Sequence, residues 1–263
     1  MPALKESALS LTITPRNPNP HLSGFTRGLA AQLKERFIFN FAIPPAALEK
    51  LMNRGWLRPQ IVGGAAVASF CMLRLEHLAP TGIPDWAGVR TVSSAYRFGA
   101  MDFPGGVSRP CVFALTRYST SAWGRCLRPL GFPWKSARSV ISQESTQDGD
   151  HRLRLTDLDG DLIFSAAFRP AKTSTSRLFP SVRDFQTFIK EGVVSYSPSY
   201  AGSQYAVVDL EKDDTTYAPM QVMEVEAPQI TQLTGVAADS LLDSALRTQG
   251  GTYRWTYRGL IGE

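Results

Sequence analysis

Segments of strand length, separated by turn signals roughly every 8 to 15 residues, run through most of this chain and constrain its fold more than any other feature. The segments alternate polar and apolar residues or run apolar, as half-buried and fully buried strands do. The strongest of them are residues 36–43, 63–78, 90–101, 109–119, 139–145, 151–170, 205–212 and 217–228. An open sheet of roughly ten strands would leave long unpaired edges. The pattern therefore predicts a mainly β (α+β) fold, a curled antiparallel β-barrel or double sheet with a few short helices and a central cavity.

Short helices are predicted at three places between the strands. Pro45, directly after the strand 36–43, suits the first turn of a helix. Residues 181–192 place apolar side chains at helical spacing and end at Gly192, so they predict a short amphipathic helix whose aromatic residues belong to the core. A third helix is predicted from about residue 122 to residue 129, after the capping residues Ser-Thr-Ser.

The chain is expected to form one domain. No low-complexity spacer divides it, and 14 Phe and 5 Trp supply a sizeable core. Residues 1–24 are predicted to be an N-terminal arm, because prolines and asparagines at 17–20 interrupt its strand pattern, and residues 25–263 the domain itself. No apolar run approaches the roughly 18 residues of a membrane span, and the first residues do not form a signal-peptide core. We expect a soluble cytoplasmic protein with no membrane partner.

The three cysteines, Cys71, Cys111 and Cys126, are an odd number without close spacing. This argues against a disulfide framework and against a zinc knuckle, and it favours a reducing compartment. Cys71 and Cys111 lie in apolar strands and are predicted to be inert core residues. Cys126 has arginines nearby that would lower its pKa, although core packing is favoured there too.

The charge pattern argues against a nucleic-acid partner. The net charge is +5, but the 28 basic residues are spread along the chain among 23 acidic ones. One local excess, from Arg117 to Arg138, contains no Asp or Glu. A solvated helix face is the favoured explanation, and the alternative is that one or two of these cations point inward and hold an anionic ligand.

Common catalytic motifs are absent from the sequence. It contains no G-x-S-x-G elbow, Walker lysine loop or H-E-x-x-H motif, which disfavours hydrolases and nucleotide enzymes. His21, His77 and His151 lie in separate segments without ligand spacing, so we expect no metal and no cofactor. The run "DLDGD" predicts a hairpin turn, because Phe168 stands where a calcium loop needs its last carboxylate.

The segment "GRCLRPLGFPWKSA", residues 124–137, resembles the acetoacetate decarboxylases, whose corresponding run reads G-F-P-K-K-L-A. The stretches "FNFAIPPAALEKLM", "GIPDWAGVRTVSSAYR" and "VSYSPSY" to "MQVMEVE" resemble still more the uncharacterised YqjF-like bacterial proteins grouped with that superfamily. The resemblance covers roughly residues 36–230. It implies a closed antiparallel β-barrel with an apolar cavity, cofactor-free carbon–carbon lyase chemistry on a small molecule, and association of copies into a homo-oligomer.

The resemblance also implies a Schiff base between a lysine and a keto acid. Only a neutral amine attacks a carbonyl, so such a lysine needs burial or a nearby cation. In register with the family motif, Trp134 takes the Schiff-base position and Lys135 that of the second lysine, which lowers the pKa of the first. Arg97 in "SAYRFG" stands where the family pattern has an acid, a change that would turn an acid into an anion-binding group.

Three functions remain open from the sequence. In the first, Lys135 is the catalytic amine or base of an enzyme acting on a keto or carboxylate metabolite, with Arg97 orienting the anion. In the second, the barrel is non-catalytic or differently catalytic and binds a small apolar or anionic metabolite. In the third, it is an interaction or structural protein whose cavity is filled by its own aromatic residues. The candidate binding residues are Arg97, Tyr96, Arg117, Trp134 and Phe132.

Overall fold

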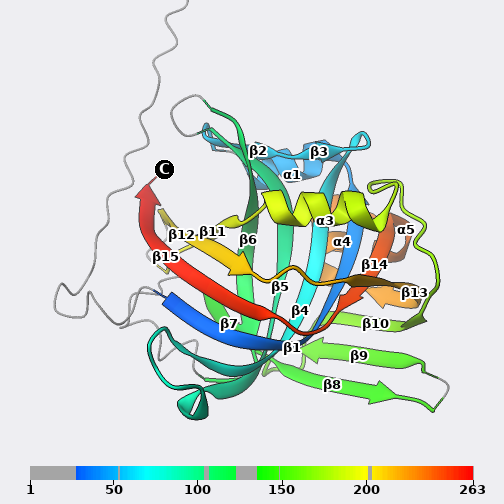
Figure 1. Cartoon of the computed structure of the whole chain (residues 1–263). Helices are drawn as coiled ribbons and strands as arrows, with labels where there is room; N and C mark the ends of the chain where they lie inside the picture. Colours follow the sequence, from blue (N-terminus) through cyan, green and yellow to red (C-terminus); the bar gives the residue numbers. More distant parts are fainter. Residues whose placement is uncertain are drawn as a thin grey trace, which may run out of the picture.

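The computed structural model describes residues 28–52, 54–103, 107–122, 135–147, 149–200 and 203–262. Strands dominate these residues, with a few short helices between them (Figure 1). The strands are β1 (Gly28–Ile43), β2 (Leu57–Pro59), β3 (Ile61–Val62), β4 (Ala65–Pro80), β5 (Val89–Asp102), β6 (Arg109–Ser119), β7 (Ser136–Arg138), β8 (Val140–Ser145), β9 (His151–Thr156), β10 (Leu162–Pro170), β11 (Val194–Pro198), β12 (Gln204–Lys212), β13 (Tyr217–Glu226), β14 (Leu242–Thr248) and β15 (Thr252–Gly262). The helices are α1 (Pro45–Leu51), the 3-10 turn η2 (Asp85–Ala87), α3 (Val182–Glu191), α4 (Pro228–Thr234) and α5 (Ala238–Leu241).

Strand pairing closes into a ring. Starting from β1, hydrogen-bonded neighbours follow in the order β4, β5, β6, β11, β12 and β15, and β15 pairs again with β1. Among the described strands the pairing is antiparallel except at β6, which pairs in parallel with β7 and β11. The curled sheet with its few helices is the fold class that the sequence predicts, and closure removes the edges that an open sheet would expose.

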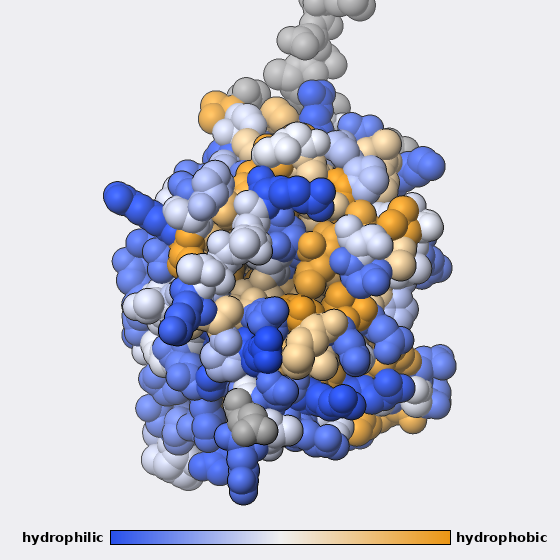
Figure 2. All heavy atoms as spheres, turned by 90° about the vertical axis from the view of Figure 1, so that its right-hand side faces the viewer, coloured by the Kyte–Doolittle hydropathy of each residue, from blue (hydrophilic) through white to orange (hydrophobic). Residues whose placement is uncertain are grey.

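A second part of the sheet, which we call the second arm of the sheet, branches from the ring at β1. The first part of β1 pairs with β15, and the part from Arg36 onward pairs with β14. From β14 the sheet continues through β13, β10 and β9 to β8, and Figure 1 shows the β8 and β9 hairpin extending to one side of the molecule. Figure 2 turns this side to the viewer and shows hydrophobic residues gathered near its centre among hydrophilic ones. β1 therefore belongs to both parts of the sheet.

The two faces of β1 supply two different environments. Phe37, Phe39 and Phe41 are fully buried in the larger hydrophobic core, where Phe39 packs against Phe164 of β10. Ile38, on the opposite face, belongs to a second core that α3 covers with Phe185. Because side chains alternate along a strand, one strand serves both cores.

Several local predictions are confirmed, and others need extension. Helix α1 begins at Pro45, and α3 is capped by Ser181 and ends before Gly192. The Asp-Gly turn joins β9 to β10, where Gly160 has a φ of 93°. β1, however, begins at Gly28, eight residues before the predicted strand, because β4 and β15 supply partners to a weakly strand-forming segment. The predicted helix at 122–129 and the arm at 1–24 lie outside the described residues.

Candidate functional site

Two adjoining cavities lie on the inner face of the ring and share Arg97 in their walls. The first has a volume of about 80 Å³ and is lined by side chains of six ring strands, together with Ser136 of β7. The second has a volume of about 50 Å³ and lies between the ring and α3, which contributes Phe188 and Ile189. A dry protein cavity of about 150 Å³ holds benzene, so these cavities fit a molecule of a few heavy atoms.

Leucine and tryptophan side chains form much of the wall of the first cavity. Leu73 and Leu75 of β4 and Trp255 of β15 line it, and Ser93 of β5 adds a hydroxyl group. The second cavity is more polar, because two arginines, a lysine and two cysteines line it together. A ligand lying across Arg97 would meet an apolar wall on one side and charged groups on the other.

Arg36 reaches the inner face of the ring because of an irregularity in β1. The register with β4 shifts between Leu33 and Glu35, after which Arg36 lies on the same face as Ile38. Its guanidinium group donates to Cys71 Sγ at 3.1 Å and to the hydroxyl of Tyr253 at 3.2 Å. A β-bulge re-aims side chains in this way, and the two hydrogen bonds fix the orientation of the buried guanidinium.

Arg97 and Arg117 come from neighbouring strands and line the first cavity together. The register of β5 and β6 shifts between Ala95 and Arg97, which places both arginines on the inner face. Arg117 donates to the hydroxyls of Ser195 at 3.0 Å and Ser197 at 3.3 Å. Burial, followed by the nearby Arg97, lowers the pKa of Arg117 to about 9, and burial is also the main cause that lowers the pKa of Arg97. Both pKa values are lowered because removing a cation from water disfavours its charged form.

Lys212, the last residue of β12, lines the second cavity beside Arg36 and Arg97. Burial lowers its pKa most, and the positive charges of Arg36 and Arg97 lower it further, to about 7. Cys71 and, more weakly, Asp214 act in the opposite direction. The carboxylate of Asp214 accepts a hydrogen bond from Lys190 at 2.9 Å. Lys212 therefore loses its proton far more readily than an exposed lysine does.

Cys71 is a fully buried member of the second core, which confirms its predicted place in the core, and it lies on the same inner face as the cationic side chains. Burial by itself would raise the pKa of its thiol. The guanidinium groups of Arg36 and Arg97 outweigh burial, so the net pKa is lowered. Cys111 also lines the second cavity, but burial and then the negative charge of Asp102 raise the pKa of its thiol. A cation beside a buried thiol favours the thiolate form.

We call Arg36, Arg97, Arg117 and Lys212 the interior cationic cluster. Within the described ranges, Arg36, Arg97 and Lys212 form no ion pair with a carboxylate. The side chains described as lining the two cavities include no Asp or Glu. Arg36 is buried and the other three cations are partly buried. Cations in such positions are normally paired, which makes the cluster a candidate site for an anionic ligand.

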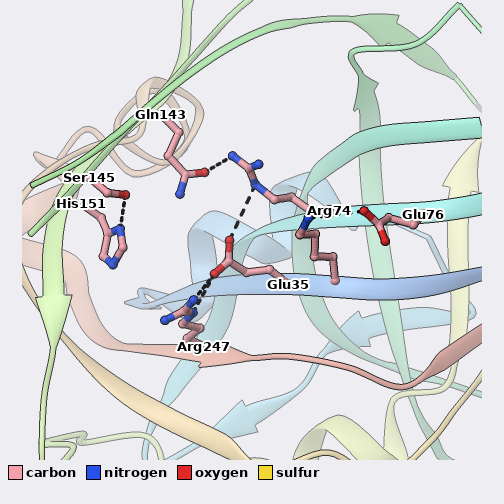
Figure 3. Close-up of polar contacts among 8 residues, drawn as sticks. Glu35, Arg74, Glu76, Gln143, Ser145, His151 and Arg247 are labelled. Carbon is pink, nitrogen blue, oxygen red and sulfur yellow. Dashed lines mark hydrogen bonds and ion pairs between the residues drawn. The ribbon is translucent and has the colours of Figure 1, made fainter. Parts of the chain in front are cut away.

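A second group of charges, which we call the Glu35 cluster, is centred on the buried carboxylate of Glu35 and has its own counter-charge. Glu35 of β1 accepts a hydrogen bond from Arg247 of β14 at 2.7 Å and lies 3.7 Å from Arg74 of β4. Arg74 also donates to Gln143 of β8, which ties the second arm of the sheet to the ring (Figure 3). Here one carboxylate holds two arginines.

The structure brings two of the predicted binding residues together and separates others. Arg97 and Arg117 line the same cavity, as described above. Tyr96 points to the opposite face of β5, where its buried hydroxyl donates to the carbonyl oxygen of Ile163 at 2.7 Å. Lys135 is exposed just before β7. Phe132 and Trp134 lie outside the described residues. The roles of these residues in binding and catalysis stay predictions.

Sequence reasoning missed Arg36, Cys71 and Lys212 as site residues. A signal was present in the alternation of β12, because Val208, Leu210 and Lys212 are spaced to share one face. The signal for Arg36 was hidden, since the bulge in β1 cannot be read from spacing.

In the described part of the chain, no three His, Cys, Asp or Glu side chains are grouped closely enough to hold a metal ion. Nor is any helix among the described residues long and apolar enough to cross a membrane.

No protein-family model matches the chain, and no curated protein matches its sequence. Solved structures do share its fold. An acetoacetate decarboxylase-like enzyme from Sphingomonas wittichii RW1 matches with a TM-score of 0.56 and 12% identity, over 90% of this chain and 93% of that one. The acetoacetate decarboxylase of Legionella pneumophila matches with a TM-score of 0.55 and 11% identity, over 89% of this chain and 87% of that one. The enduracididine biosynthesis enzyme MppR, complexed with pyruvate, matches with a TM-score of 0.53 and 13% identity, over 89% of each chain.

The chain therefore has the fold of the acetoacetate decarboxylase-like enzymes. This confirms the fold expected from the sequence resemblance, which rested on short motifs and on the strand pattern.

Proposed function

We propose that this protein is an enzyme of the acetoacetate decarboxylase-like superfamily that binds a small keto acid inside its ring of strands and acts on the carbonyl group. The observation that carries the proposal is the interior cationic cluster, in which Arg36, Arg97 and Lys212 form no ion pair with a carboxylate in the described part of the chain. Within the superfamily, we propose a relation to the YqjF-like bacterial proteins, which the resemblance of the sequence motifs supports.

The chemistry of the cluster supports a carboxylate ligand. A guanidinium group matches a carboxylate with two parallel hydrogen bonds, and Arg97 lies in the wall that the two cavities share. The volumes of about 80 and about 50 Å³ suit a molecule of a few carbon atoms. Burial strengthens the attraction, because water does not screen the charges there.

Carbon–carbon lyase chemistry would follow from an amine in the same space. A neutral amine condenses with the keto group, and the resulting iminium withdraws the electron pair of a neighbouring bond that breaks. Such a reaction requires no metal and no cofactor. The MppR enzyme, which has a similar fold, is known in complex with pyruvate, and this supports a keto acid as the ligand class to test first.

A binding protein without catalysis is the second candidate. It is favoured by Trp134, which stands at the position of the family's Schiff-base lysine, and by the exposure of Lys135. In this case the interior cationic cluster would hold an anionic metabolite and release it unchanged.

Thermal stabilisation by keto acids tests the binding part of both candidates. We expect pyruvate or acetoacetate to raise the Tm of the protein, while methyl acetoacetate, which lacks the charge, leaves it unchanged. Arg97→Met should remove the shift, and Arg152→Met, at an exposed position of β9, should keep it. If no small carboxylate changes the Tm, the proposed function is wrong.

A further inference from the structure

We infer that Lys212 is the amine that forms a Schiff base with the keto acid. It would take the role that the sequence resemblance assigns to the segment GFPWKSA, residues 131–137. This inference rests on the proposed function, because it requires a keto acid bound at Arg97.

The position of Lys212 is the first argument. Among the lysines of the described ranges, Lys212 is the one that lines either of the two cavities. It ends β12 and follows Val208 and Leu210 on the inner face of the ring, so a rigid strand carries its backbone. Lys135 is exposed, and Lys190 on α3 pairs with Asp214 at the surface.

The charge state of Lys212 is the second argument. An ammonium group has no lone pair with which to attack a carbonyl carbon, so a Schiff-base lysine must lose its proton near the working pH. Burial and the charges of Arg36 and Arg97 lower the pKa of Lys212 to about 7, which leaves a large neutral fraction.

Arg36 acts as a positioning residue in this arrangement. It is held by Cys71 Sγ and the hydroxyl of Tyr253, and it lines the cavity into which Lys212 also faces. Because its charge stays fixed close to the amine, it keeps the ammonium form unfavourable. Arg97 then has two effects, since it binds the carboxylate of the substrate and lowers the pKa of the amine.

The bond changes are those of imine formation. The lone pair of the Lys212 nitrogen forms a bond to the carbonyl carbon, and the carbonyl oxygen takes up two protons and leaves as water. The carbon–nitrogen double bond that remains is an iminium while it carries a proton. For a β-keto acid, the bond to the carboxylate carbon then breaks, CO₂ leaves and the electron pair moves into the iminium to give an enamine. A proton added to the enamine carbon regenerates the iminium, and water hydrolyses it to release the ketone and free the lysine.

Trapping with borohydride tests the inference on the full chain. The protein is incubated with pyruvate or acetoacetate and reduced with sodium borohydride, which converts the imine into a stable secondary amine. Peptide mass spectrometry then locates the adduct. We expect it on Lys212, absent from Lys212→Met and retained in both Lys135→Ala and Lys190→Met. Lys190→Met is the matched control, because Lys190 also lies close to Asp214 but outside the two cavities.

The dependence of trapping on pH gives a second measurement. The rate should rise with pH around a midpoint of about 7, which is the pKa of Lys212. In Arg36→Met the midpoint should move to higher pH, because one of the two cations that lower the pKa is lost. A purely structural role of Arg36 would change the amount of folded protein and leave the midpoint in place.

The outcomes separate the inference from the proposed function. If keto acids raise the Tm but leave no adduct, or leave it on Lys135, the inference is wrong and the binding proposal stands. If keto acids neither raise the Tm nor leave an adduct, the proposed function fails and the inference fails with it. The Tm and circular dichroism of Lys212→Met, measured without ligand, show whether loss of the adduct reflects loss of the amine or loss of folding.

Discussion

The Glu35 cluster and the interior cationic cluster are both charged groups inside a β-sheet protein, and β1 contributes neighbouring residues, Glu35 and Arg36, to the two of them. In the Glu35 cluster one carboxylate holds Arg74 and Arg247 (Figure 3). In the interior cationic cluster, Arg36 donates to a thiol and a phenol, and Arg97 and Lys212 have no carboxylate partner among the described residues.

If the proposed function is right, the difference separates charges that serve the fold from charges that are kept for a ligand. A buried cation paired with an internal acid is compensated whether or not a ligand is present. A cation without one lowers the stability of the empty protein and is compensated when an anion binds. The Glu35 cluster is therefore expected to serve the architecture, and the interior cationic cluster the proposed function. Substitutions that remove the carboxylate from the Glu35 cluster, or add one to the interior cationic cluster, test the comparison.

Removal of the acid in the Glu35 cluster should have the largest effect on stability. Glu35→Gln leaves Arg74 and Arg247 without their counter-charge, and we expect the free energy of unfolding to fall by about 2 to 3 kcal/mol. For a chain of this size that corresponds to a drop in Tm of about 5 to 10 °C. Glu49→Gln, at an exposed position of α1, is the control and should leave Tm unchanged. An unchanged Tm in Glu35→Gln would mean that the cluster does not hold the sheet together.

An acid added to the interior cationic cluster should convert it into a second balanced cluster. Gln60 lines the second cavity, and Gln60→Glu changes one atom of the side chain. We expect the Tm of the empty protein to rise and the affinity for keto acids to fall about tenfold, since an internal carboxylate competes with the ligand, a change of about 1.4 kcal/mol. Calorimetric titration with acetoacetate measures the affinity. Unchanged affinity together with a lower Tm would contradict the comparison.

The stability contributed by the interior cationic cluster should also depend on pH. The pKa of Lys212 is lowered in the folded protein from 10.5 to about 7. Between these pH values the unfolded chain binds more protons at Lys212 than the folded protein does. The free energy of unfolding therefore rises with pH across this range, and the destabilisation caused by the charged lysine is gone above the unfolded pKa. The difference in Tm between wild type and Lys212→Met should therefore shift in favour of wild type as the pH rises from 7 to 10. A difference that stays constant over this range would show that burial does not perturb the lysine.

The smallest effect is expected at the surface pair of Lys190 and Asp214. Both side chains are exposed, so Asp214→Asn should change the free energy of unfolding by less than about 0.5 kcal/mol. Because Asp214 raises the pKa of Lys212 slightly, its loss should move the midpoint of borohydride trapping to lower pH. Equal trapping profiles in both proteins would show that this carboxylate does not reach the amine.

Much of the fold could be predicted from the sequence because strand periodicity and turn residues are local signals. The strand 109–119, the helix at 181–192 and the Asp-Gly turn are all found in the structure. The first half of β1 could not be predicted, since its strand conformation depends on β4 and β15, which are distant in sequence. The short strands β2, β3 and β7 are also fixed by partners more than by their own residues.

The candidate site was predicted in part. Arg97 and Arg117 were proposed as anion-binding residues, and the structure places both on one cavity wall. Arg36 was not recognised, because the bulge before it decides which face its side chain takes. Lys212 could not be predicted from the sequence, because its properties depend on burial and on two arginines from other strands.

The alternating faces of β1 have a consequence for how this protein can change during evolution. Phe37 fills the larger core, and Arg36 and Ile38 face the inner side of the ring. Inserting or deleting one residue in this strand would reverse the faces, placing a cation in the aromatic core and a phenylalanine among the charges. Homologues should therefore vary in residue type along β1 far more often than in its length. Single substitutions on the inner face can change ligand specificity, while the number of residues in β1 is expected to stay the same.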